Sequence, residues 1–190
     1  QQVYARYSSY YTDLLARLEQ GQTQDQAAQF AIRADLDNIR AAWLWAVEQG
    51  RVAELASAVK GLSRFYYLTG FLSEAVNMLM PAVMRVRAIC NGQSQPAPEV
   101  QNLLARLLLE KAFFDAMLDR RTLAEQSIQE AIQLAQTLVD PALEALAHLR
   151  LGDIAWSRAD YHLHRTAYGH SLALVRQTHQ LSLEAHCLSN

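Results

Sequence analysis

Three histidines gather in the segment DYHLHRTAYGH, where His162, His164 and His170 fall within nine residues and Asp160 is close by. Imidazole and carboxylate groups bind zinc and related metals, and on a helix such ligands must be three or four residues apart to share a face. His162 and His164 are two residues apart, so in a helix their side chains diverge by about 160°. The spacing therefore argues against a shared metal site, and the alternative interpretation is that His164 packs at a small-residue position while the other two are solvated. A helical metal-dependent enzyme stays open as the lesser alternative.

The remaining reactive side chains also lack the arrangements that covalent or acid–base catalysis needs. The sequence contains no Gly-x-Ser-x-Gly elbow, and its two cysteines, Cys90 and Cys187, are far apart and in no metal or redox spacing. Two carboxylate pairs fall on predicted helix surfaces, where such groups are usually solvated: Glu125 with Glu130, and Asp115 with Asp119. We therefore expect a non-enzymatic protein without a cofactor.

Composition and charge narrow the class of protein further. Hydrophobic residues make up 51% of the 190 residues and are rich in Ala and Leu, which favours a folded helical chain. The formal net charge of −2, without a basic block, argues against direct nucleic-acid binding. No apolar run approaches the roughly 18 residues that a membrane span needs. Two unpaired cysteines fit a reducing cytosol, and a chain that begins at Gln1 and stops inside a helical pattern is expected to be a piece of a longer cytoplasmic protein.

Apolar residues recur at helical spacing along almost the whole chain. One stripe runs through Leu55, Val59, Leu62 and Tyr66 and ends at Gly70. Residues 91–98, NGQSQPAP, cannot continue a helix, so we expect a linker there between helix pairs in 1–91 and further pairs in 99–190, the last helix being truncated. Short turns joining about nine predicted helices indicate antiparallel hairpins. The last two pairs are spaced by roughly 40 residues, and the 91–98 loop stretches the earlier spacing, which fits a single helix-pair solenoid.

The segment 145–178 resembles a tetratricopeptide (TPR) repeat. The residues that carry the resemblance are Leu151-Gly152, Trp156, Asp160-Tyr161, Tyr168 and Ser171. His148 and His164 stand where Trp and Ala are usual, so the repeat is degenerate. In such a repeat the glycine lets the neighbouring helix approach closely, and aromatic residues fill the space between helices. The resemblance implies an all-α fold, a right-handed TPR-like antiparallel helix-pair solenoid.

Residues 1–85 show a second resemblance. The two runs that carry it are DNIRAA (37–42) with Trp45-Ala46, and RFYY (64–67) with Gly70 and Glu74-Ala75. They are similar to the helical segment of bacterial STAND-type signal-transduction ATPases, which include LuxR-like and AfsR-like transcriptional regulators. In that family the array follows an ATPase and winged-helix core, and the 190 residues contain no phosphate-binding GxxxxGK[ST] motif. The resemblance implies neighbouring ATPase and winged-helix domains in a parent chain, with this array as the sensor.

The TPR resemblance also implies a binding face, because the first helices of successive pairs line the concave side of a solenoid. The residues that the alignment places on that face are Lys60, Arg64, Tyr67, Arg106, Glu110, Asp153 and Trp156, with Phe113 on the same helix as Arg106. Arginine and aromatic side chains together are typical of peptide and small-ligand grooves. The alternative for Tyr67 and Trp156 is that they are core between repeats.

The aromatic run Phe65-Tyr66-Tyr67 cannot form one binding platform, because consecutive helical residues point about 100° apart. Tyr66 is predicted core, Phe65 is predicted to pack on a neighbouring pair, and Tyr67 is predicted to face the hollow. The sequence as a whole predicts a protein–protein interaction and signal-sensing module of a larger cytoplasmic bacterial regulator. It would bind a protein or peptide partner, or a small inducer, in its concave face. A purely structural adaptor is the alternative.

Overall fold

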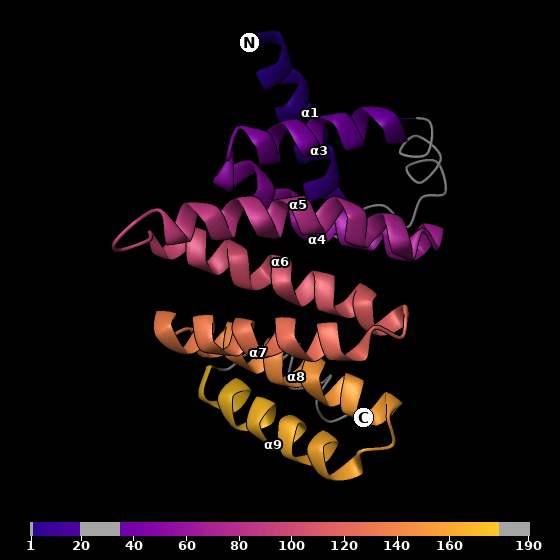
Figure 1. Ribbon diagram of the computed structural model, residues 1–190, viewed down its shortest axis with the longest axis vertical. Coiled ribbons are helices and arrows are strands. Elements are labelled where there is room, and N and C mark those ends of the chain that lie inside the picture. Colours follow the sequence, from indigo (N-terminus) through magenta and orange to yellow (C-terminus); the bar gives the residue numbers. More distant parts are fainter. Residues whose placement is uncertain (1, 20–34, 179–190) are drawn as a thin grey trace. The chain divides into compact units, whose positions relative to one another are not determined.

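The computed structural model describes residues 2–19 and 35–178, and within these ranges every regular element is a helix (Figure 1). The helices are α1 (Gln2–Glu19), α3 (Leu36–Glu48), α4 (Val52–Thr69), α5 (Leu72–Asn91), α6 (Pro98–Met117), α7 (Arg121–Leu138), α8 (Pro141–Ser157) and α9 (Tyr161–Thr178). The all-α prediction is confirmed, while the right-handed solenoid stays a prediction. The predicted truncated last helix, which contains Cys187, lies outside the described residues. No helix in the described ranges is both long and apolar enough to cross a membrane.

The chain divides into two compact units, Gln1–Leu103 and Leu104–Asn190, and the boundary falls inside α6. Between α5 and α6, residues 92–97 form no helix, at the Asn-Gly and proline sequence where we expected a linker. Within the first unit α4 and α5 form a hairpin whose turn contains Gly70 at φ 76°, a left-handed conformation that suits glycine. Within the second unit Asp140 caps α8, because its carboxylate accepts a hydrogen bond from the Leu143 backbone N–H at 3.0 Å.

The first unit is built on a close contact between α1 and α4. A Cβ atom added to Gly61 would lie 1.8 Å from the Leu15 carbonyl oxygen, so only glycine lets the two helices approach this far. The buried Ser8 hydroxyl lies 3.2 Å from the Ala42 carbonyl oxygen of α3, which ties α1 to a third helix.

The aromatic run of α4 divides as its helical geometry predicts. Tyr66 is fully buried and Phe65 is 4% exposed, so both are core of the first unit. Tyr67 is 52% exposed and points away from that core. The three rings therefore do not form one platform, and only Tyr67 is available at the surface.

The second unit contains the helices α8 and α9, which lie side by side and are in extensive contact (Figure 1). A Cβ atom on Gly152 would lie 2.2 Å from the Tyr168 ring, which confirms the predicted close approach at this glycine. The buried Ser171 hydroxyl donates to the Ala145 carbonyl oxygen at 2.8 Å, so a small residue is needed there as well. The residues that carry the TPR resemblance thus hold α9 against α8.

A charged pair is buried on α6, where the sequence predicted a solvated carboxylate. Asp115 is 1% exposed, and the Lys111 ammonium donates to its Oδ2 at 2.6 Å. Lys111 also lies 3.3 Å from the Ser127 hydroxyl of α7, which itself donates to the Leu123 carbonyl oxygen. The prediction that Asp115 is a surface residue is therefore wrong, because a lysine one turn earlier supplies its counter-charge in the interior.

Candidate functional site

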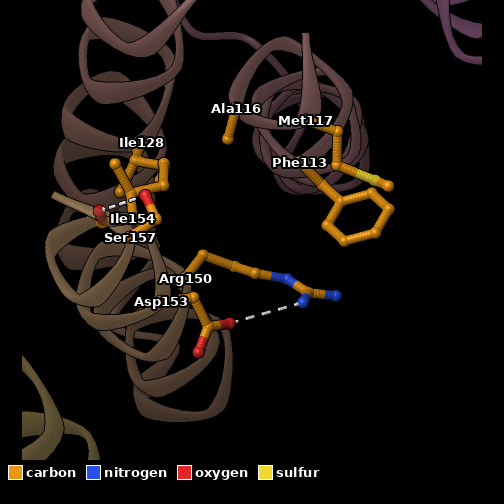
Figure 2. A pocket seen from close by; sticks show the side chains of 8 residues that line it. All are labelled: Phe113, Ala116, Met117, Ile128, Arg150, Asp153, Ile154 and Ser157. Atoms are coloured by element: carbon orange, nitrogen blue, oxygen red, sulfur yellow. Dashed lines mark hydrogen bonds and ion pairs between the residues drawn. The ribbon is translucent and has the colours of Figure 1, made fainter. Parts of the chain in front are cut away.

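A pocket of about 350 Å³ opens between α6, α7 and α8 of the second unit (Figure 2). Its lining consists of Phe113, Ala116 and Met117 from α6, Ile128 from α7, and Arg150, Asp153, Ile154 and Ser157 from α8. Most of these side chains are apolar, and the polar ones come from one helix. This combination of an apolar cavity with a few polar groups is typical of binding pockets.

Helical spacing explains why these residues share one cavity. On α6, the two other lining residues follow Phe113 at intervals of three and four. On α8, the other lining residues follow Arg150 at intervals of three, four and seven. Residues at these intervals lie on one face of a helix, so α6 and α8 each present a single stripe to the pocket. Figure 2 shows the two stripes on opposite sides, with Ile128 beside the α8 stripe.

The polar part of the pocket is an opposite-charge pair on α8. The Arg150 Nη1 atom lies 3.6 Å from the Asp153 Oδ2 atom, and the two side chains are 30% and 37% exposed. The Arg150 guanidinium carbon lies 5.1 Å from the centre of the Phe113 ring, within the range of a cation–π contact. On the other side, the Tyr168 hydroxyl of α9 donates to Asp153 Oδ1 at 2.5 Å. Both charged groups are thus held in place by aromatic residues from other helices.

Of the residues predicted for the binding face, the structure brings Asp153 into this pocket. Trp156 lies outside the lining, and its indole ring contacts Tyr161 at 5.5 Å and His164 at 5.1 Å between ring centres. Trp156 is 59% exposed, so it is not core within its own unit. Arg106 and Glu110 are half-buried on α6, one or more turns before the part of that helix that lines the pocket.

The three predicted residues of the first unit lie together on α4. Lys60, Arg64 and Tyr67 are all exposed, and their spacing of four and three places them along one stripe of α4. Leu68, 50% exposed, follows them at the end of the helix. We call these three residues the α4 stripe; whether they and the pocket belong to one concave face stays a prediction.

Sequence reasoning missed Arg150, Met117 and Ile154 as lining residues. Arg150 was missed because the TPR alignment was used to choose inward positions, and that choice did not include it. A signal was present in the helical spacing, because Arg150 precedes the predicted Asp153 by three residues and Ile154 follows it directly. Phe113 was named on its helix and does line the pocket.

The histidine-rich segment shows no metal-binding geometry in the part of the chain that the structure describes. No group of three or more His, Cys, Asp or Glu side chains there could hold a metal ion. The His164 Nδ1–H lies 3.0 Å from the Gly152 carbonyl oxygen, to which it donates, and His164 is half-buried between α8 and α9. His162 is exposed, and the exposed His170 has its ring 5.1 Å from that of His148.

Several residues of the runs that are similar to STAND-type regulators contact one another within the first unit. Arg40 of α3 forms an ion pair with Glu74 of α5, and both belong to the matching runs. The buried Tyr66, from the same run as Glu74, lies close to Arg40. Burial raises the pKa of the Tyr66 phenol, and the positive charge of Arg40 acts in the opposite direction. These residues therefore connect α3, α4 and α5 within the first unit.

Comparison of the sequence with protein-family models and with curated proteins gives no match. What the pocket can do must therefore be worked out from its own residues.

Proposed function

We propose that the chain is a non-enzymatic interaction and sensing module, and that the pocket between α6, α7 and α8 binds its partner. The observation that supports this most strongly is the pocket itself, with its apolar walls and its fixed Arg150–Asp153 pair. Its volume of about 350 Å³ is within the range of small-ligand pockets and suits one apolar side chain with its neighbouring main chain.

A binding role fits the chemistry of the lining better than catalysis does. The lining contains one acidic group, Asp153, which is already engaged by the Tyr168 hydroxyl and by Arg150. The lining residue Ser157 donates its hydroxyl to the Ile154 carbonyl oxygen at 2.7 Å, and it has no histidine in the lining to act as its base. The same groups are well suited to hold a ligand in a fixed orientation.

The sensing part of the proposal is supported by the resemblance of residues 1–85 to STAND-type bacterial regulators. In a cytoplasmic parent protein with ATPase and winged-helix domains, occupation of the pocket would bias the neighbouring switch. Such coupling requires that the ligand bind the two states of the parent with different affinity. The proposal includes a peptide partner or a small inducer as the signal.

The α4 stripe favours a second candidate function, that of a structural adaptor. Lys60, Arg64 and Tyr67 combine positive charge with an exposed aromatic ring, as protein-binding surfaces often do. An adaptor would use such a surface to hold a second protein without any response to a ligand. The sensing module would bind its ligand through the second unit, whereas the adaptor would bind its partner through the first unit.

A peptide array with a pocket-filling variant tests the proposal. We expect fluorescein-labelled Gly/Ser octapeptides with one central apolar residue to bind the protein and raise fluorescence anisotropy. Ala116→Leu places extra methyl groups in the cavity, so it should weaken this binding by at least about tenfold. The matched control is Ala41→Leu, which adds the same atoms at an exposed position of α3 and should leave binding unchanged.

Three results would count against the pocket. If no peptide in the array binds the wild-type protein, the proposed function fails. Equal binding by Ala116→Leu and the wild type would show that the peptides bind elsewhere. Loss of binding in an Arg64→Ala variant, with Ala116→Leu unaffected, would favour the adaptor surface on α4 instead.

A further inference from the structure

The pocket wall carries one positive and one negative side chain in direct contact. Arg150 and Asp153 are one helical turn apart on α8 and 3.6 Å from each other, and both line the cavity (Figure 2). The formal charge of this part of the wall is therefore zero. At the same time, the wall offers a strong hydrogen-bond donor next to a strong acceptor.

Both groups keep capacity for a further hydrogen bond. A guanidinium has five N–H donors in a fixed fork, and Asp153 faces only its Nη1 atom. A carboxylate has about four lone-pair sites, of which the Tyr168 hydroxyl occupies one, while Arg150 lies at ion-pair distance. The Phe113 ring lies against the guanidinium and the Tyr168 hydroxyl against the carboxylate, so neither charged group is free to turn away from the pocket.

The Arg150–Asp153 pair determines which polar group of a ligand can bind next to it. A ligand carboxylate that approaches Arg150 also comes close to the Asp153 carboxylate and is repelled. A ligand ammonium that approaches Asp153 also comes close to the Arg150 guanidinium and is repelled. Because both side chains are only about one-third exposed, water screens these repulsions less than it would on an open surface. A neutral amide avoids both, since its C=O accepts from Arg150 and its N–H donates to Asp153.

We infer that the pocket binds a neutral amide, that of a peptide main chain, through Arg150 and Asp153, with the apolar side chain of the same residue in the cavity. Phe113, Met117, Ile128 and Ile154 form the apolar surface for that side chain. The inference rests on the proposed function, because it names the chemistry of the ligand that the same pocket takes.

Three small probes separate the neutral amide from the charged alternatives. N-acetyl-leucinamide is neutral, N-acetyl-leucine replaces its terminal amide by a carboxylate, and leucinamide replaces its acetamide by an ammonium. At about pH 6 the leucinamide amine is protonated, because α-amino groups titrate near 7.7–8.0. In NMR titrations of the ¹⁵N-labelled protein, we expect N-acetyl-leucinamide to bind at least about tenfold more tightly than either charged probe.

Two conservative variants should reverse the preference in opposite directions. Asp153→Asn keeps an oxygen for the Tyr168 hydroxyl but leaves Arg150 without its counter-charge, so N-acetyl-leucine should become the preferred probe. Arg150→Gln leaves Asp153 alone, so leucinamide should become the preferred probe. A purely structural role of the pair would weaken all three probes together, without a change in their order.

The outcomes distinguish the two proposals. If the array peptides bind but N-acetyl-leucine or leucinamide equals N-acetyl-leucinamide on the wild type, the amide inference falls and the proposed function stands. An unchanged order of probes in both variants would also overturn the inference. If neither the peptides nor any probe binds, both proposals fall together.

Discussion

Removing Asp115 should destabilise the second unit strongly, because it leaves a buried ammonium without its counter-charge. Lys111 and Asp115 have side chains that are 7% and 1% exposed, and their charged atoms are 2.6 Å apart. The Asp115 Oδ1 atom finds no hydrogen bond among the described residues, and Arg120 lies 3.8 Å from it, so the lysine is its main partner. Breaking such a pair from one side costs about 3–5 kcal/mol, which is a large part of the stability of a small unit. We therefore expect Asp115→Ala to lower the free energy of unfolding by that amount.

Replacing both partners should restore most of the lost free energy of unfolding. In the double variant Lys111→Met with Asp115→Leu, no charge is left in the interior, and the apolar side chains fill a similar volume. Urea unfolding followed by circular dichroism at 222 nm measures Asp115→Ala against the wild type. The same measurement on Lys111→Met, Asp115→Leu and their double variant completes the cycle that gives the coupling energy. A loss below about 1 kcal/mol for Asp115→Ala would refute the reasoning, because it would mean that the ammonium remains hydrated. A double variant as unstable as the single one would refute it too.

Two further predictions concern the contact between α8 and α9. Gly152→Ala should cost about 1–3 kcal/mol, because its methyl group would overlap the Tyr168 ring, whereas Gly169→Ala, with open space around it, should stabilise the helix by about 0.5–1 kcal/mol in the same thermal melt. Burial lowers the pKa of His148, the neighbouring His170 lowers it further, and Glu144, 3.9 Å away, acts in the opposite direction. Since the unfolded chain then binds the proton more readily, stability should fall as the pH drops through 6.5, and His148→Gln should show a smaller fall between pH 7 and 5. A cost for Gly169→Ala equal to that for Gly152→Ala, or identical pH profiles for His148→Gln and the wild type, would contradict these predictions.

Helical periodicity was enough to predict the elements of the described chain, because most helices bury one apolar stripe, although α6 is buried on several sides. The TPR pattern also predicted the closest contact of the second unit, since Gly152 and the aromatic at 168 are local features of one helix pair. It gave no signal for the close helix contact of the first unit. Gly61 is required by α1, which lies far away in the sequence, and such a contact leaves no local signal.

The candidate site was predictable only in part, for the same reason. Asp153 was predicted because the TPR alignment gave it an inward position, but the pocket is lined by residues of three helices, and contacts between helices leave no local signal. Asp115 was predicted at the surface because only its spacing from Asp119 was considered. The lysine four residues before it was the signal of a buried pair, and a contact with Ser127 of the next helix completes it.

Chemical-shift mapping tests the central claim most directly. On addition of N-acetyl-leucinamide to the ¹⁵N-labelled protein, we predict that the shifted backbone amides cluster in 113–117 and 150–157, with that of Ile128 between them. The amides of the α4 stripe should not move. Shifts confined to residues 60–67, or a spectrum that does not change at saturating probe, would contradict the assignment of the pocket as the binding site.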